Sequence, residues 1–368
     1  MPRTPFDVFF TGPAREHLLR AVREALAEDG PDVAANAVFG AGDVLRAEIV
    51  AKEDTVLAGL PLLPIILAEA ETVVKADTAP AGLPPAPVIP AATDAPAPVQ
   101  CNAQVFAFTP DGACRENHSV FRLLGPTCRV RGGAPAAGGV KTKRCTVPGA
   151  WESTACAEDG DCLSAGTVAA AVTGSARVVL RAERVILNFL CRLSGIAALT
   201  RKYVNALEGT GVQLLDTRKT APGLRYPDKY AVLAGGGRNH RKTLGELPML
   251  KDTHIEAAGG ITPAVQRLRA HLPAGAPLEV ECRTSAEALE AAACGVSRIM
   301  LDNMRPEMVG TTLDMLPSHV EIEISGGIAL DNIRSFASAG AKRRADFISV
   351  GRITHSAPAA DFSMRICR

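Results

Sequence analysis

The sequence predicts an α/β chain whose second half folds as parallel βα units. After about residue 200, short apolar segments with strand character alternate with helical patterns, as parallel sheets require. Each of those apolar segments runs directly into charged residues or glycine. Aromatic residues make up 4% of the chain and alanine is frequent, which favours helices packed on aliphatic strands over an all-β design.

The overall charge excludes two broad classes of partner. Forty Lys and Arg residues against thirty-nine Asp and Glu residues give a net charge of +1, so no global attraction to nucleic acid or anionic lipid exists.

The start of the sequence lacks the basic residues and long apolar run of a secretory signal. The longest apolar stretch, 56–68, contains two prolines and is too short to cross a bilayer. We therefore expect a cytoplasmic protein without nucleic-acid or membrane partners.

The first half of the chain combines regular elements with two irregular segments. Residues 15–29 carry the apolar stripe of an amphipathic helix, and residues 44–59 contain strand-like pieces. Residues 77–99 are dominated by Ala and Pro, which predicts an extended insertion. Residues 131–143 are rich in Gly and Ala and also have little to bury, whereas the intervening residues 120–130 look ordered.

Ten cysteines are present, and six of them lie between Cys101 and Cys162. No C-x-x-C pair occurs among these six, which disfavours a zinc site. Because no secretory signal is visible, we expect free thiols rather than disulfides.

From about residue 158 onward the sequence again predicts regular structure, which becomes an alternation of strands and helices. Residues 167–180 are β-branched and apolar, and residues 183–199 predict a long helix. Six strands are expected at 212–215, 248–250, 278–280, 298–301, 320–324 and 346–350, with helices between several of them, notably at 262–271, 285–294 and 329–339.

The residues that end these strands carry the functional signal. They are Asp216-Thr217-Arg218-Lys219, Lys251-Asp252, Glu281, Asp302-Asn303, Ser325-Gly326-Gly327 and Gly351. In a βα barrel the carboxyl ends of the strands meet on one face, where active sites are built. Any one of these residues could be an ordinary turn or helix cap, but their repetition at six ends favours a binding site.

Nine motifs occur in a fixed order along the chain. They are E-R-V-I-L-N-F-L at 183–190, L-S-G-I-A at 193–197, D-T-R-K-T-A-P-G-L-R at 216–225, G-G-G-R-N-H-R at 235–241, K-D-T-H-I at 251–255, E-V-E at 279–281, L-D-N at 301–303, S-G-G-I at 325–328 and T-H-S at 354–356. In content and order they resemble the quinolinate phosphoribosyltransferases, also called carboxylating nicotinate-nucleotide pyrophosphorylases. The resemblance covers 158–356 and, more weakly, 15–67.

This resemblance implies a fold, an assembly and a reaction. The fold would be an N-terminal α/β sandwich domain followed by an incomplete parallel α/β barrel. We assign residues 1–198, with both insertions, to the sandwich, 199–350 to the barrel, and 351–368 to a segment returning toward the sandwich. The implied assembly is a homodimer with shared active sites, which could associate further. The implied reaction joins quinolinate to phosphoribosyl pyrophosphate, giving nicotinate mononucleotide, pyrophosphate and CO₂, with Mg²⁺.

The same resemblance assigns roles to residues at the strand ends. Both substrates are anions, and Arg forks bind carboxylates in a bidentate manner. The residues implied for substrate binding are Arg184 from the neighbouring subunit, Arg218, Lys219, His240, Arg241, Lys251, Ser325, Gly326, Gly327, Gly351 and His355. The residues implied for catalysis are Lys219, Lys251, Glu281 and Asp302, of which Glu281 and Asp302 would also hold the metal ion. Glycine-rich turns suit the 5′-phosphate because backbone N–H groups can approach it closely.

Three alternatives remain at this stage, and the chain departs from the family at Thr253, at the two insertions and at the acidic loop 28–32. Thr253 stands where the family has Asn, so an amide is replaced by a hydroxyl. A molybdenum-locus relative with the same motifs, a Schiff-base aldolase using a strand-end lysine, and a non-catalytic scaffold are the competing readings. Pyrophosphate release that requires quinolinate would argue against the molybdenum-locus relative. Borohydride trapping tests the aldolase, and deletion of the Ala/Pro segment tests the scaffold.

Overall fold

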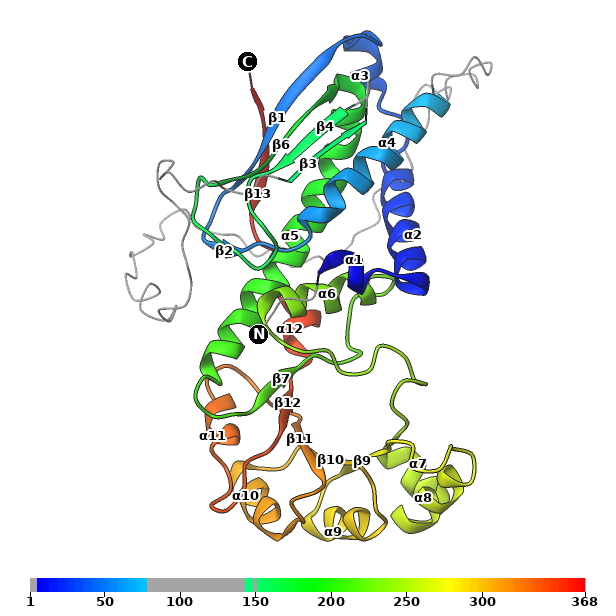
Figure 1. Ribbon diagram of the computed structural model, residues 1–368, viewed down its shortest axis with the longest axis vertical. Helices are drawn as coiled ribbons and strands as arrows, with labels where there is room; N and C mark the ends of the chain where they lie inside the picture. Colours follow the sequence, from blue (N-terminus) through cyan, green and yellow to red (C-terminus); the bar gives the residue numbers. More distant parts are fainter. Residues whose placement is uncertain (1–4, 78–142, 148–150, 368) are drawn as a thin grey trace, which may run out of the picture.

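The computed structural model describes residues 5–77, 143–147 and 151–367, and of 143–147 the backbone alone. Most of the Ala/Pro segment predicted at 77–99, most of the Gly-rich segment at 131–143 and all of the predicted ordered stretch at 120–130 lie outside the described residues. The described chain forms two layers of structure, an antiparallel sheet with helices and, below it in Figure 1, a parallel sheet with helices.

The first sheet has five strands in the order β13-β1-β6-β4-β3. Their bounds are β1 Val44–Ala51, β3 Lys143–Val147, β4 Trp151–Ala155, β6 Val168–Ser175 and β13 Phe362–Cys367. All neighbouring pairs are antiparallel. Along β1, Leu45, Ala47 and Ile49 are buried, the alternation expected of a strand with one face on the core. The predicted strand pieces at 44–59 are thus confirmed, and the C-terminal strand β13 returns to pair with β1.

Helices cover this sheet. The predicted helix at 15–29 is α2 (Gly12–Glu28), and its buried stripe is Leu18, Val22 and Leu26. The remaining elements of this half are α1 Phe6–Phe9, α3 Val33–Val38, β2 Thr55–Val56, the 3₁₀ turn η1 Leu60–Leu62, α4 Leu63–Asp77 and β5 Cys162–Leu163. The sequence reading had not singled out α4, because its apolar run 56–68 is interrupted by two prolines.

The second sheet is an incomplete barrel of six parallel strands in the order β7-β12-β11-β10-β9-β8. The strands are β7 Gln213–Leu215, β8 Met249–Leu250, β9 Glu279–Cys282, β10 Arg298–Asp302, β11 Glu321–Ser325 and β12 Phe347–Ser349. All six strands predicted from the sequence are confirmed. The two outer strands, β7 and β8, do not pair with each other among the described residues, so the barrel stays open on that side.

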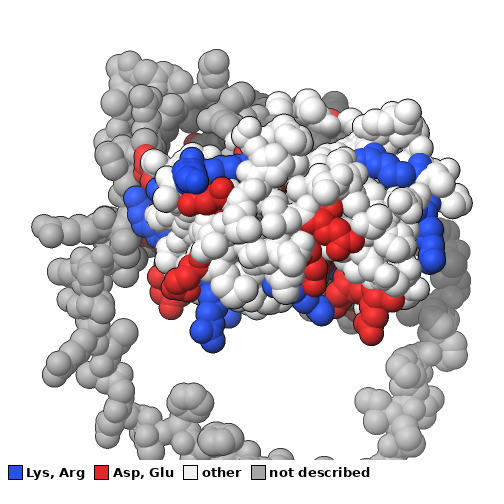
Figure 2. Space-filling view, turned by 90° about the horizontal axis from the view of Figure 1, so that it is seen from below, with Lys and Arg blue, Asp and Glu red and all other residues white. Residues whose placement is uncertain are grey.

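The helices of the second half lie between and beside these strands. They are α6 Arg225–Gly235, α7 Asp252–Ala258, α8 Ile261–Arg269, α9 Ser285–Ala293, α10 Pro306–Met315, α11 Ile333–Ala337 and α12 Arg352–His355. Figure 2 views this half from below, and positive and negative side chains are mixed on the face it shows. No helix of the described residues is long and apolar enough to cross a membrane.

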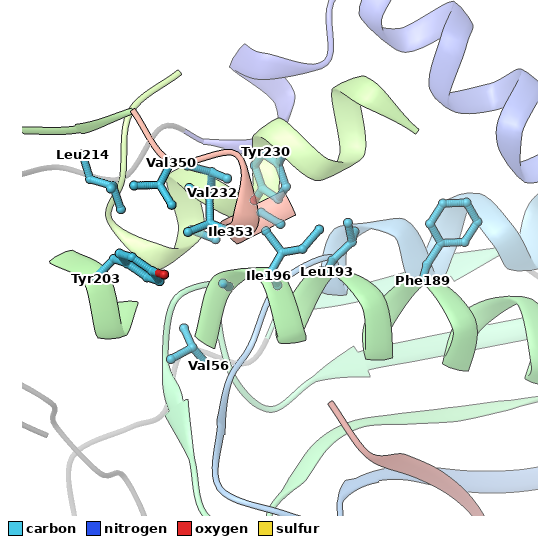
Figure 3. Close-up of a cluster of buried hydrophobic side chains, with 14 of the residues drawn as sticks. Val56, Phe189, Leu193, Ile196, Tyr203, Leu214, Tyr230, Val232, Val350 and Ile353 are labelled. Atoms are coloured by element: carbon cyan, nitrogen blue, oxygen red, sulfur yellow. The ribbon is translucent and has the colours of Figure 1, made fainter. Parts of the chain in front are cut away.

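A single long helix, α5 (Ala176–Ala206), belongs to both halves. Residue 198, where we place the predicted domain boundary, falls inside this helix. Its buried residues Phe189, Leu193, Ile196 and Tyr203 continue from the first half toward Leu214, Val232, Val350 and Ile353 of the second, as Figure 3 shows. The apolar core is therefore continuous between the two sheets.

Gly195 is the point where α5 meets the C-terminal segment. A Cβ atom added there would lie 2.0 Å from the carbonyl oxygen of Pro358 and 3.0 Å from the backbone nitrogen of Ala360. Both neighbours are backbone atoms, which cannot rotate away as a flexible side chain can. The S-G motif at 194–195 thus permits a close helix-to-backbone approach.

We predict that Gly195→Ala lowers the free energy of unfolding by about 2 kcal/mol or more, because overpacking a filled core is costly. The matched control is Gly42→Ala, since a Cβ atom at Gly42 would meet nothing within 4 Å. Urea denaturation followed by circular dichroism measures both. Equal stability of the two variants would show that the C-terminal segment can move away from α5.

The cysteines require one correction. Within the described residues, five cysteines are free, namely Cys156, Cys191, Cys282, Cys294 and Cys367. Cys162, however, is disulfide-bonded, so the expectation of free thiols is wrong for this residue. Whether two thiols can bond depends on the distance and direction of their Cβ atoms, which spacing along the sequence does not reveal.

Candidate active site

The carboxyl ends of β8, β9 and β10 bring a lysine and two carboxylates together. Lys251 follows β8, and its Nζ lies 3.9 Å from a carboxylate oxygen of Glu281 on β9. Burial, followed by the charge of Asp302 at the end of β10, raises the pKa of Glu281. Two acidic groups in one place favour a cation beside them, and Lys251 supplies part of that charge.

A cavity of about 600 Å³ opens beside this group. Four cations line it, Arg218 after β7, Arg241 in the loop that follows α6, Lys251, and Arg267 on α8. The remaining wall is mostly apolar and comes from Leu244, Pro248, Met249, Leu250, His254, Ala258, Ala264, Leu268 and His271. An apolar cleft with a few cations suits a flat anionic molecule.

Arg218 and Arg241 are held differently. The guanidinium of Arg241 donates to the carbonyl oxygen of Leu247 at 2.9 Å, and burial and then the charge of Arg218 lower the pKa of Arg241. The Nε atom of Arg218 is buried and has no hydrogen-bond partner among the described residues. Such a donor is costly to leave unpaired.

Two glycine turns follow β11 and β12. Gly326 has φ +91°, and a Cβ atom there would lie 2.8 Å from the backbone nitrogen of Asn303, so only glycine fits. At Gly351 a Cβ atom would lie 3.0 Å from Cδ of Lys219 and 3.3 Å from Cδ2 of His355. Lys219, Gly351 and His355 therefore form one compact group, and Thr354 Oγ1 donates to the carbonyl oxygen of Lys219 at 2.8 Å.

The turn Ser325-Gly326-Gly327 adjoins the acidic pair. Asp302 is the register partner of Ser325, and the N–H of Asn303 donates to the carbonyl oxygen of Ser325 at 2.9 Å. The ends of β8, β9, β10 and β11 thus place Lys251, Glu281, Asp302 and the β11 turn in a row, while Lys219, Gly351 and His355 lie at the β12 turn. Thr253, the residue that departs from the family, is exposed on α7 and does not line the cavity.

Eight of the eleven predicted substrate-binding residues do not line the cavity, namely Arg184, Lys219, His240, Ser325, Gly326, Gly327, Gly351 and His355. Arg184 is on the exposed side of α5. His240 is 8% exposed and lies inside the barrel, where its Nε2 is 3.2 Å from Glu279 and 3.3 Å from Glu323. Its predicted direct contact with substrate therefore stays a prediction, and in this structure its ring nitrogens face protein groups.

The surroundings of His240 perturb its ionisation. Burial opposes protonation, but the neighbouring carboxylates of Glu279 and Glu323 outweigh it and raise the pKa of His240 to about 9. Burial, followed by the charge of Glu323, also raises the pKa of Glu279. An imidazolium has a proton on each nitrogen and could not accept the N–H of Arg241, whose nitrogen lies 2.7 Å from His240 Nδ1, so this contact fixes the neutral ring in spite of the raised pKa. In that neutral form the ring proton is on Nε2, which lies 3.2 Å from Glu279 and 3.3 Å from Glu323.

A buried ion pair supports the loops that carry the cations. Lys229 on α6 and Asp216 at the end of β7 are fully buried, and their charged atoms lie 2.5 Å apart. Asp216 also accepts from the N–H of His240 at 2.8 Å and from Asn239 at 2.6 Å. Burial, partly offset by Lys229, raises the pKa of Asp216 to about 6.

Sequence reasoning assigned no role to Lys229, Glu279 or Glu323, although Glu279 belongs to the E-V-E motif. A usable signal existed for the glutamates, because strand side chains alternate between the two faces. Glu279 precedes Glu281 by two residues and Glu323 precedes Ser325 by two, so both share the inward face of the site residues. Nothing comparable marks Lys229, whose burial depends on how α6 packs.

Comparison with known proteins decides the family. The model described as "Quinolinate phosphoribosyl transferase, C-terminal domain" matches residues 196–365, and the corresponding N-terminal domain model matches residues 138–194. The chain belongs to the quinolinate phosphoribosyl transferase family. The resemblance inferred from the nine motifs is thereby confirmed.

Relatives across this family agree in sequence and in fold. A Bacillus subtilis protein named "Probable nicotinate-nucleotide pyrophosphorylase (carboxylating)" is 42% identical over 209 residues, which is 57% of this chain and 71% of that protein. The Homo sapiens nicotinate-nucleotide pyrophosphorylase (carboxylating) is 42% identical over 54% of this chain and 67% of its own. The crystal structure of NadC from Streptococcus pyogenes is 30% identical, has a TM-score of 0.68, and is covered over 99% of its length by 100% of this chain. The predicted α/β fold class with its incomplete barrel is confirmed.

Proposed function

We propose that this quinolinate phosphoribosyl transferase family member transfers the phosphoribosyl group of phosphoribosyl pyrophosphate to quinolinate. The products are nicotinate mononucleotide, pyrophosphate and CO₂, in de novo NAD biosynthesis. The observation that carries the proposal is that Arg218, Arg241 and Lys251 line one cavity beside the Glu281–Asp302 acidic pair. An isolated activated lysine, as in an aldolase, would not need two arginines in the same cavity wall.

The cavity suits quinolinate by charge and by shape. Quinolinate carries two carboxylates on a flat ring, and two arginines can each form paired hydrogen bonds to a carboxylate. Arg218 offers a buried unpaired donor, and Arg241 is held by the backbone in a fixed position. The apolar side chains of Pro248, Leu250 and Leu268 would contact the ring.

The strand ends suit the sugar donor. At the anomeric carbon, displacement of pyrophosphate develops positive charge on the ribose ring, which nearby carboxylates stabilise. Glu281 and Asp302 would supply that negative charge, and Lys219 and Lys251 would bind the departing pyrophosphate. The backbone N–H groups of the glycine turns at 325–327 and at 351, with His355, would bind the 5′-phosphate.

We also propose Mg²⁺ as the cofactor, held by Glu281 and Asp302. Hard carboxylate oxygens are the ligands this ion prefers, and it usually completes its shell with water and substrate phosphates. The raised pKa of Glu281 fits a site in which two carboxylates gain stability when a cation joins them. Bound there, Mg²⁺ would neutralise charge on the pyrophosphate.

Decarboxylation needs no further group from the protein. Once glycosylated, the ring nitrogen is positive and stabilises the carbanion left when the adjacent carboxylate departs as CO₂, and this carbanion then takes up a proton to form the C–H bond of the product. The protein has to orient that carboxylate and keep water away. The apolar cavity wall meets the second requirement, and the arginines meet the first, so we assign no covalent nucleophile.

We further propose a homodimer in which Arg184 completes the partner's site. Arg184 is exposed on α5 and does not line the cavity of its own chain. Arg184 belongs to the family motif, yet the site of its own subunit does not use it. Such a residue fits a role in the active site of a second subunit. The cytoplasmic location expected from the sequence stays a prediction.

Mixing two inactive variants tests this sharing. We predict that Arg184→Ala and Arg241→Ala homodimers are both inactive, whereas subunit exchange at equal concentration restores about a quarter of wild-type turnover, because half the dimers are mixed and each has one intact site. Each variant mixed with itself is the control. Verified mixed dimers without turnover would contradict a shared site.

The direct test of the proposed function is a product assay. Purified protein with quinolinate, phosphoribosyl pyrophosphate and Mg²⁺ should form nicotinate mononucleotide and equimolar pyrophosphate, and EDTA should stop the reaction. Pyrophosphate release without quinolinate would favour a molybdenum-locus type of substrate. A Schiff base trapped by borohydride would favour the aldolase.

A further inference from the structure

The barrel interior contains a polar cluster that the reaction described above does not use. His240 lies between the carboxylates of Glu279 on β9 and Glu323 on β11, and all three side chains are buried. Arg298 at the start of β10 is 3.6 Å from Glu323 and also binds the exposed Glu321 at 2.8 Å. Among the described residues, His240 and Arg298 are the basic groups paired with Glu279 and Glu323, and neither the two carboxylates nor His240 Nε2 makes a hydrogen bond of regular geometry.

The position of one proton decides what this cluster does. Because the N–H of Arg241 donates to Nδ1 of His240, Nδ1 has no proton and Nε2 must carry it. The Nε2–H then lies between the two carboxylates, at 3.2 Å and 3.3 Å, and their negative charge attracts it. A metal ion could bind three such buried ligands, but a histidine that binds metal through Nε2 keeps its proton on Nδ1. The hydrogen bond from Arg241 therefore disfavours a metal ion here.

The cluster is connected directly to the cavity wall. His240 is fixed at its backbone as well as its ring, since Asp216 accepts from its N–H and Lys229 donates to its carbonyl oxygen at 3.0 Å. Its ring in turn fixes the backbone N–H of Arg241, the next residue. Arg241 then extends to Leu247 and lines the cavity. The carboxylates, the imidazole and the guanidinium form one continuous chain of contacts.

We infer that Glu279 and Glu323 are positioning residues for quinolinate binding, which hold the Nε2–H form of His240 and thereby the place of Arg241 in the cavity wall. This inference rests on the proposed function. Neither carboxylate lines the cavity, so both would act through His240. Loss of both acceptors should free the imidazole to turn and release the N–H of Arg241.

Steady-state kinetics test the inference. Replacing both glutamates by leucine should raise KM for quinolinate about ten-fold, the effect of one lost hydrogen bond to a charged group, with kcat and KM for phosphoribosyl pyrophosphate changed less than about two-fold. Replacing both by glutamine keeps an acceptor oxygen and should restore KM for quinolinate. The matched control is Glu321→Gln, on the same strand and bound to the same arginine, which should behave as wild type.

Two outcomes of that experiment would overturn the inference. They are an unchanged KM for quinolinate in the leucine variant, and equal losses in kcat and in both KM values. Because the wild-type protein is assayed in parallel, failure of the proposed function would appear separately as absence of turnover with quinolinate.

A measurement on the unaltered protein covers the case in which the leucine variant does not fold. Nitrogen-15 NMR of labelled histidine, with His240→Gln to assign the signal, should show Nδ1 of His240 unprotonated and Nε2 protonated. A protonated Nδ1 would overturn the inference. So would one equivalent of tightly bound metal in the purified protein that is absent from the glutamine variant.

Discussion

Replacing Arg218 by Ala should lower kcat/KM for quinolinate about a thousand-fold, the usual range for removing one member of a desolvated charge pair. The side chain supplies a buried donor without a partner, at the cavity wall and directly after β7. Its loss would remove a bidentate contact to a carboxylate and leave the dianion with Arg241 and Lys251. The assay is formation of nicotinate mononucleotide at saturating phosphoribosyl pyrophosphate.

Two further substitutions make this result specific. Arg218→Lys keeps the charge but cannot form the paired hydrogen bonds of a guanidinium, so it should recover little activity. Lys242→Ala removes the cation that follows Arg241 in the sequence. Lys242 does not line the cavity, and its Nζ lies 5.4 Å from the centroid of the Phe9 ring. The variant should keep wild-type turnover. If Arg218→Ala also did so, the quinolinate site would have to lie elsewhere.

Replacing Lys229 by Met should lower the free energy of unfolding by about 3–5 kcal/mol, because it leaves a buried carboxylate without its counter-charge. Lys229 and Asp216 are both fully buried, and Asp216 already has a pKa raised to about 6 by burial. In the variant that pKa rises further. A carboxyl group with a raised folded-state pKa stabilises the fold at low pH and loses that contribution as the pH rises, so the deficit should grow toward neutral and alkaline pH.

A second substitution, at Asp216, tests whether the unpaired carboxylate causes the loss of stability. Lys229→Met combined with Asp216→Asn removes both charges and keeps an acceptor for the N–H of His240, so much of the lost stability should return. Lys75→Met breaks an exposed pair on α4 and should leave the urea midpoint unchanged. A single variant as stable as wild type would mean that water reaches Asp216 in solution.

Much of the barrel could be predicted because its signals are local. Each strand is a short apolar run that ends in a polar residue or glycine, so both its place and the face that its end builds are visible in the sequence. Arg218, Lys251, Glu281 and Asp302 follow from that pattern. The antiparallel half has weaker signals, and its sandwich architecture came from resemblance to a family.

What escaped prediction depends on packing between distant segments. The disulfide at Cys162 depends on Cβ geometry, and the burial of Lys229 depends on how α6 packs, and spacing along the sequence reveals neither. Helix α6 contains Pro227, Asp228 and Lys229, and these residues obscure its apolar face. Asp228 is satisfied by Arg192 of α5 at 2.7 Å, a pairing across 36 positions.

The shared helix α5 has a mechanical consequence. Its 31 residues span about 46 Å at 1.5 Å per residue, and buried side chains occur from Ala176 to Tyr203. If either sheet unfolded on heating, the apolar side chains of α5 that pack against it would become exposed to water. The core of the other sheet, which includes the same helix, would lose stability as well. Melting should accordingly be a single concerted event, and a cut that separates the two halves within α5 would leave neither fragment able to fold alone.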